Sequence, residues 1–122
     1  MSTQIDQPTY NECRKIITRV FKKLRLKGNG GFCAKQNFGW CRSEGWWLLE
    51  QLLGDRYDST PCVWYHWQAN EDLKREREVY LAWGDTEEHA RTICRLFEEE
   101  QGVTVEWDGT KNKCIKLKFG DS

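Results

Sequence analysis

The sequence predicts a single α+β domain, with a mostly antiparallel sheet of about five strands and two long helices on one face. Three observations predict it. Two long segments carry apolar residues at three-and-four spacing, shorter segments are rich in Val, Tyr and Trp, and short connections join the strand pairs. The 122 residues are 39% hydrophobic, which is enough for one core and too little for two domains. We therefore expect one domain over residues 9–119, with flexible ends at 1–8 and 120–122.

The first half of the chain predicts helix, strand, helix and strand in turn. A helix is expected over residues 9–26, because Thr9 and Glu12 have capping-box spacing and an apolar stripe follows them. Residues 31–38 predict a short strand, and a second helix runs to Leu53 from a cap at Ser43. The strongest strand signal is residues 62–68, where Val, Trp and Tyr are strand-prone.

The second half predicts strand, helix and a closing hairpin. Residues 69–78 are highly charged and predict an exposed connection, and residues 78–83 predict a strand. Asp85 and Glu88 have capping-box spacing and begin the last helix. Residues 103–107 and 113–119 alternate apolar and polar around Asp108-Gly109, which is a hairpin signal. The predicted order is α-β-α-β-β-α-β-β.

Charge and cysteine content exclude several classes of protein. The net charge is zero, from 19 basic and 19 acidic side chains, so composition does not favour nucleic-acid binding. Basic residues crowd the first helix and acidic residues the last, which predicts a solvated face or charge pairing between the two helices. The start is polar, and no apolar run could span a bilayer. We expect a cytoplasmic protein without membrane contact, whose six cysteines are reduced.

Metal binding is the first chemical role to weigh, because Cys33, Cys41, Cys62 and His66 are residue types that bind zinc. Their spacing includes no Cys-x-x-Cys pair, and Cys62 and His66 would stand about 13 Å apart along a strand. We therefore expect small buried thiols, no metal and no cofactor.

Four short motifs follow one another between Phe32 and Leu117. They are Gln36-Asn37-Phe38, Tyr65-His66-Trp67-Gln68, Val79-Tyr80-Leu81-Ala82-Trp83-Gly84 and Val105-Glu106-Trp107-Asp108-Gly109. In this order they resemble a family of small bacterial proteins classed as a domain of unknown function. The resemblance implies the fold and no activity. The family often carries a cysteine-rich run after its Asn-Phe pair, whereas residues 39–45 of this chain hold only Cys41.

The candidate binding site is one face of the strand predicted over residues 62–68. In a regular strand Trp64, His66 and Gln68 share that face, which offers an indole for stacking and polar groups for edge recognition. The edge of this face would carry Trp40, Arg42, Trp46 and Trp47. This pattern predicts a non-enzymatic domain that binds a small aromatic or nucleotide-like ligand, or a protein partner as an inhibitor or sequestering protein does. Self-association is left open.

Two alternatives remain. In the first, the indoles fill an ordinary core and His66 is a structural histidine. In the second, the chain is a small hydrolase or transferase with His66 as general base beside a cysteine or a carboxylate.

Overall fold

The computed structural model describes residues 8–26, 32–84, 86–110 and 113–120. The elements in chain order are α1 (Tyr10–Leu26), β1 (Cys33–Lys35), α2 (Arg42–Leu53), η1 (Gly54–Ser59), β2 (Cys62–Trp64), α3 (Trp67–Glu76), β3 (Glu78–Gly84), α4 (Glu87–Glu98), β4 (Val103–Glu106) and β5 (Ile115–Phe119). The five strands form one sheet in the order β1-β2-β3-β5-β4. β1 and β2 are parallel, and the other neighbours are antiparallel. The predicted α+β class and mostly antiparallel sheet are confirmed.

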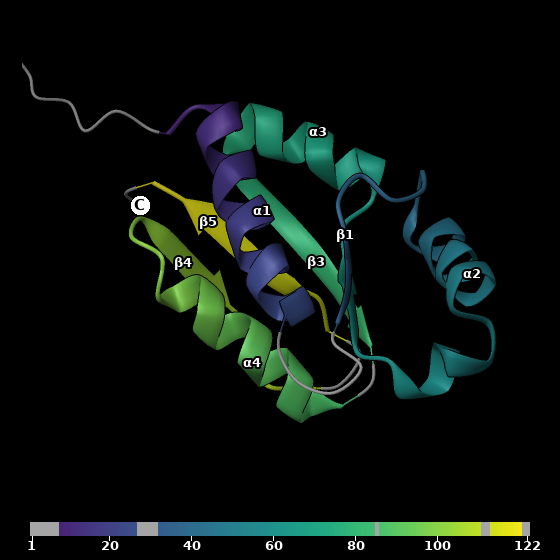
Figure 1. Ribbon diagram of the computed structural model, residues 1–122. Coiled ribbons are helices and arrows are strands. Elements are labelled where there is room, and N and C mark those ends of the chain that lie inside the picture. The colour runs from purple at the N-terminus through teal and green to yellow at the C-terminus, as the bar shows by residue number, and fades with distance from the viewer. Residues whose placement is uncertain (1–7, 27–31, 85, 111–112, 121–122) are drawn as a thin grey trace, which may run out of the picture.

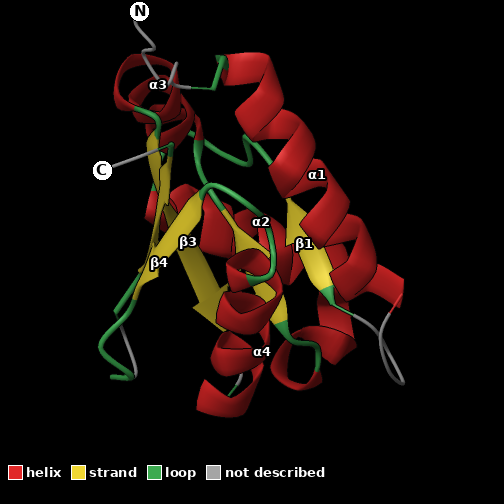
Figure 2. Ribbon diagram, turned by 90° about the vertical axis from the view of Figure 1, so that its left-hand side faces the viewer, coloured by secondary structure: helices red, strands yellow, loops and turns green. Residues whose placement is uncertain are grey.

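Two separate apolar clusters place the helices on opposite faces of the sheet. The larger cluster joins α1, α3 and α4 to one face, and α1 and α4 lie side by side in front of the strands (Figure 1). The smaller cluster joins Leu49 and Leu53 of α2 to Cys62, Trp64 and Ala82 on the other face. In Figure 2, α1 lies beside β1, and β3 and β4 are farther from that helix. Two long helices therefore share a face as predicted, and a third, α3, joins them there.

The largest difference from the predicted elements falls on residues 62–78. The strand predicted over 62–68 ends at Trp64, and the stretch from Trp67 to Glu76 forms α3. The apolar positions of α3 are few, with Ala69 and Leu73 buried beside a polar Asn70, so the helical stripe is short. The Asn70 amide oxygen accepts a 2.8 Å hydrogen bond from the Tyr10 hydroxyl of α1. The charged residues of α3 favour a helix and form ion pairs at i,i+3, between Lys74 and Glu71 and between Arg75 and Asp72.

One of the three predicted helix N-caps is confirmed. In α1 the capping box is confirmed, because Thr9 N–H donates to Glu12 and Glu12 N–H donates to the Thr9 hydroxyl. The other two caps were predicted wrongly. Cys41 rather than Ser43 precedes α2, and its sulfur accepts from the Glu44 N–H. Thr86 caps α4; the predicted cap, Asp85, lies outside the described residues.

The C-terminal hairpin is confirmed, with β4 and β5 antiparallel and Val105 opposite Leu117. The strand predicted over 31–38 is reduced to Cys33–Lys35. The ends predicted to be flexible, 1–8 and 120–122, lie largely outside the described residues, so their flexibility stays a prediction.

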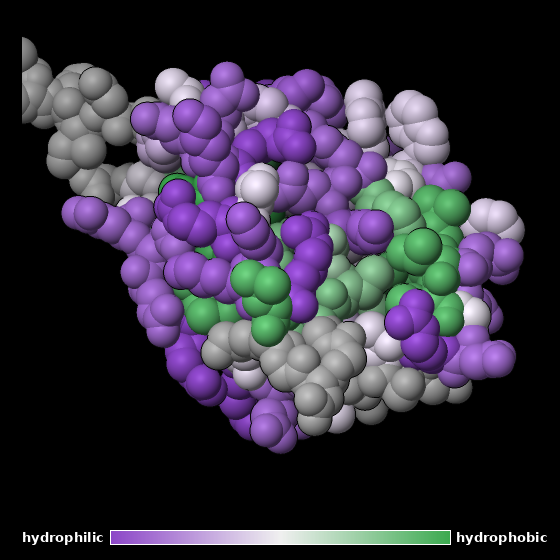
Figure 3. Space-filling model, viewed as in Figure 1, coloured by the Kyte–Doolittle hydropathy of each residue, from purple (hydrophilic) through white to green (hydrophobic). Residues whose placement is uncertain are grey.

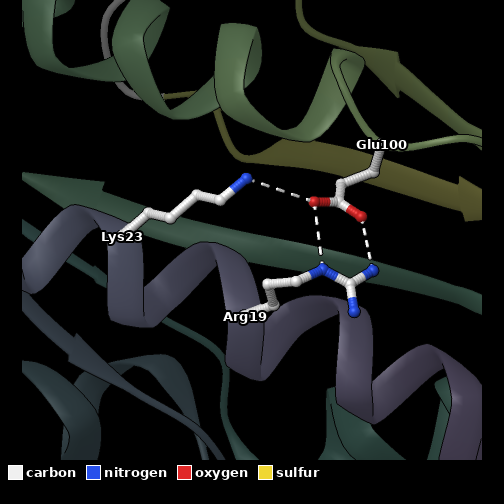
Figure 4. A network of polar contacts seen from close by, with 3 residues as sticks. All are labelled: Arg19, Lys23 and Glu100. Atoms are coloured by element: carbon white, nitrogen blue, oxygen red, sulfur yellow. Dashed lines mark hydrogen bonds and ion pairs between the residues drawn. The ribbon is translucent and has the colours of Figure 1, made fainter.

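Charge pairing between the first and last helices is confirmed (Figure 4). Glu100, just beyond α4, accepts from the Arg19 guanidinium at 2.5 Å and lies 3.6 Å from the Lys23 ammonium. The Arg19 hydrogen bonds hold the pKa of the Glu100 carboxyl below its usual value. The Arg19 and Lys23 side chains are about half exposed, whereas the Glu100 side chain is largely covered. Water screens the two cations, so the contact orients the two helices more than it stabilises them.

Helix α2 approaches the sheet closely because a glycine faces a tryptophan there. A Cβ placed on Gly45 would lie 2.2 Å from the ring of Trp64, which is fully buried. Trp46 also packs edge-on against that ring, with centroids 5.9 Å apart. Apolar side chains gather over α2, as Figure 3 shows. Leu52 of this helix is exposed.

We expect Gly45→Ala to destabilise the fold by about 1–2 kcal/mol. Alanine favours a helix over glycine by about 1 kcal/mol, but overpacking a closed core costs about 1–3 kcal/mol, and the Trp64 ring beside Gly45 is fully buried. Urea unfolding of both proteins measures the difference. In a Trp64→Leu background the clash is removed, so the same substitution should become neutral or stabilising. A stabilised Gly45→Ala single variant would contradict this packing.

Candidate functional site

The predicted row of Trp64, His66 and Gln68 does not exist, because the chain turns into α3 after β2. Trp64 is fully buried under α2, and its indole N–H has no hydrogen-bond partner among the described residues. His66 is half-buried and is the N-cap of α3, while Gln68 is exposed in the first turn of that helix. The three side chains therefore have different roles, and the sheet-face interpretation is wrong.

Trp46 and Trp47 of α2 make no ring contact with Trp40 among the described residues. Trp46 is half-buried against Trp64 and Tyr57, and its ring lies over Gly84 of β3. Trp47 is 58% exposed on α2. Trp46 thus closes the smaller cluster, and Trp47 is a separate surface residue.

Trp40 instead meets a tryptophan that the strand prediction assigned to the opposite face. Its ring lies 4.8 Å from that of Trp67, at an interplanar angle of 46°. The two side chains are 62% and 42% exposed, so this contact lies at the surface. We call Trp40, Arg42, His66 and Trp67 the indole site.

Backbone hydrogen bonds between two loops bring the members of the indole site together. The loop after β1 and the loop after β2 run side by side, since Phe38 N–H donates to Tyr65 O and Trp67 N–H donates to Gly39 O, both at 2.9 Å. Gly39 has a φ of +84°, and a Cβ there would lie 3.0 Å from the backbone nitrogen of Gly45. A side chain at this position would be strained and would crowd α2.

The two loops leave neighbouring parallel strands at the same end and then diverge. β1 leads into α2 on one face of the sheet, and β2 leads into α3 on the other. Both helices therefore begin at the carboxyl ends of their strands, beside the indole site. The positive end of each helix dipole points toward this end of the sheet.

His66 links the site to α3 through one ring nitrogen. Its Nδ1 accepts a 3.2 Å hydrogen bond from the Ala69 N–H, so the ring is neutral and its proton is on Nε2. Burial lowers the pKa of the imidazole, the Asp72 carboxylate opposes that shift, and the Arg42 guanidinium adds to it. Arg42 is exposed in the first turn of α2 and lies near enough to act on this ring.

Trp40 thus meets Trp67, which sequence reasoning missed, and the charge of Arg42 acts on His66 beside this pair. The signal was the run Trp64-Tyr65-His66-Trp67, whose aromatic residues favour a strand while His66 serves as a helix cap. Among the described residues, no three His, Cys, Asp or Glu side chains come together as a metal site would require. Nor is any described helix long and apolar enough to cross a bilayer.

Fold and site together define a small α+β domain with exposed aromatic residues at the start of two helices. A model of the family described as "Domain of unknown function (DUF6891)" matches residues 3–120. The chain belongs to this family. No curated protein and no solved structure matches it.

The neutral His66 cap makes stability depend on pH. Because the folded pKa is lowered, the unfolded chain binds more protons as the pH falls below the unfolded value of 6.5. The contribution is complete above that value and is lost as the pH falls through the folded pKa. His66→Ala should cost about 1 kcal/mol at neutral pH, whereas His66→Asn keeps a capping oxygen.

Urea unfolding at about pH 8 and about pH 5 measures both effects. The acid-induced loss of stability in the wild type should be smaller in His66→Asn, which has no imidazole to protonate. An equal loss in both proteins would show that His66 does not cap α3 as a neutral ring.

Proposed function

We propose that this protein is a non-enzymatic binding domain whose indole site holds a small, planar, anionic ligand of nucleotide-like chemistry. The observation that carries the proposal is the contact between Trp40 and Trp67, two indoles exposed by 62% and 42% at the start of two helices. Trp40 lies just before α2, and Trp67 opens α3.

The exposed indoles support an aromatic ligand. An indole that is open to water contributes little to the stability of its own fold, while its flat face can stack on a planar ring. Stacking a base on an aromatic side chain contributes about 1–3 kcal/mol and suits every base, because each has a π-face.

The surrounding groups support a negative charge on that ligand. The Arg42 guanidinium can hold a phosphate or carboxylate with paired N–H groups. Two helix N-termini face the same region, and the dipole of each favours an anion there. The Nε2–H of His66 is a further donor.

The topology adds independent support. In open sheets, ligands bind outside the carboxyl ends of parallel strands, at the point where the following helices go to opposite faces. β1 with α2 and β2 with α3 have this arrangement.

A hydrolase or transferase with His66 as general base is less well supported. A general base needs a free ring lone pair, and the one on Nδ1 accepts the Ala69 N–H while Nε2 carries the proton. The same imidazole can donate to a ligand without leaving its cap. We therefore propose a binding protein in preference to an enzyme.

Calorimetric titration of the full chain with adenosine and guanosine monophosphates tests the proposal. Saturable one-site binding is expected, and Trp40→Ala or Trp67→Ala should each weaken it about fivefold to 150-fold through lost stacking. Arg42→Ala should weaken the binding of the nucleotides while leaving that of the uncharged nucleosides unchanged.

Trp47→Ala is the matched control, because this indole is equally exposed but lies outside the indole site. Its affinity should equal that of the wild type. Absence of saturable binding for nucleotides and nucleosides alike would overturn the proposal and leave a protein partner as the occupant of the two indoles.

A further inference from the structure

Two cysteines face each other across the parallel strands at one edge of the sheet. Cys33 of β1 is the in-register partner of Cys62 of β2, and both side chains belong to the cluster under α2. Neighbouring strands lie about 4.8 Å apart, and a disulfide joins Cα atoms about 4.4–6.8 Å apart. Paired residues of neighbouring strands point to the same face of the sheet, so the side chains of Cys33 and Cys62 lie beside each other.

The surroundings of Cys33 favour its thiolate. The Cys62 hydrogen bond is the main cause that lowers the Cys33 pKa to about 7; burial opposes it, and Lys35, Arg25 and Arg56 add positive charge. Arg25 is held in place by a 2.7 Å hydrogen bond to the Ala34 carbonyl. At neutral pH a large share of Cys33 is therefore in the nucleophilic form.

The Cys62 thiol has two acceptors for its single proton. Its Sγ lies 3.2 Å from the Thr60 carbonyl oxygen, and the Cys33 sulfur is the other acceptor. When Cys33 ionises, the Cys62 proton can turn toward the new negative charge. The pair thus stabilises one thiolate and keeps one proton in reserve.

The two sulfurs differ in their exposure to solvent, and this difference gives them different roles. β1 is an edge strand and Cys33 is half-buried, so a small reagent can reach it, whereas Cys62 is 2% exposed in β2. Two of the other cysteines lack this chemistry, because burial raises the pKa of Cys13 and of Cys94 to about 11. Cys41 is exposed at the start of α2, away from the strand pairing.

We propose that Cys33 and Cys62 form a redox-active dithiol that a hydroperoxide oxidises reversibly to a disulfide. The Cys33 thiolate attacks the terminal peroxide oxygen, the O–O bond breaks, and the leaving oxygen takes up a proton. Cys33 becomes a sulfenic acid, oxidised by two electrons. The Cys62 sulfur then attacks the Cys33 sulfur; the S–S bond forms, the S–O bond breaks, and hydroxide leaves with the Cys62 proton as water. The proposal does not depend on a ligand at the indole site.

Mass spectrometry of the full chain tests it directly. The protein is treated with a small excess of hydrogen peroxide, quenched with acid, alkylated with iodoacetamide and digested. We expect a loss of two hydrogens from the intact mass, a peptide pair linked through Cys33 and Cys62, and full recovery of both thiols with dithiothreitol. Cys62→Ala should stop at the sulfenic acid, which dimedone traps on Cys33.

Cys41→Ser is the matched control, since it removes an exposed thiol outside the pair and should form the same linked peptide. A second measurement needs no disulfide. The pH dependence of Cys33 alkylation should have its midpoint near 7 in the wild type and a higher midpoint in Cys62→Ala. Oxidation spread evenly over all cysteines, or over-oxidation of Cys33 without a linked peptide, would overturn the proposal, as would an unchanged alkylation midpoint.

Discussion

The parallel pairing of β1 with β2 is the constraint on which both proposed sites depend. Three residues of each strand lie in register. Backbone hydrogen bonds between the two segments continue past the strands, from Phe38 to Tyr65 and from Trp67 to Gly39. This continuation holds the two loops together until α2 and α3 begin, so Trp40 and Trp67 meet at the ends of the strands. The same register puts Cys33 opposite Cys62 nearer the strand starts. An antiparallel pair would have sent the two loops to opposite ends of the sheet.

Close packing of α2 is the second requirement, and it explains a polar group that would otherwise be costly. The Trp64 indole N–H is buried without a partner among the described residues, which costs about 1–3 kcal/mol. The ring fills the space between α2 and the sheet, with Gly45 against it and Trp46 and Phe38 edge-on beside it. Burying so large an apolar surface offsets the lost hydrogen bond. A smaller residue would satisfy the polar requirement and leave a cavity.

The sequence predicts the class of fold, α1, the stripe of α4 and the closing hairpin, because each carries a strong local signal of apolar period or turn residues. It misses α3, because Val63, Trp64 and Tyr65 favour a strand, whereas the chain forms a helix from Trp67 onward. A histidine acting as a helix cap has no distinctive spacing, so nothing at His66 marked the change. The indole pair follows from this error. The sequence places Trp67 on the predicted strand, and only the structure shows that it belongs to α3. Its contact with Trp40 depends on the pairing of two loops that are far apart in the sequence.

The tryptophans of this chain fall into groups that their surroundings separate. Trp64 and Trp46 fill the cluster under α2. Trp83 and Trp107 pack edge-on, and each donates its indole N–H to a backbone carbonyl, of Lys113 and Thr110 respectively. These four have a structural explanation, because core filling or hydrogen bonding accounts for the ring. Trp40 and Trp67 have neither a core to fill nor such a bond among the described residues, yet they lie against each other at the start of two helices. The contact between these two indoles has only a small structural effect, because it leaves most of Trp40 exposed to water. A stacking partner from outside the chain would cover that remaining surface, which is why the pair points to binding rather than to stability.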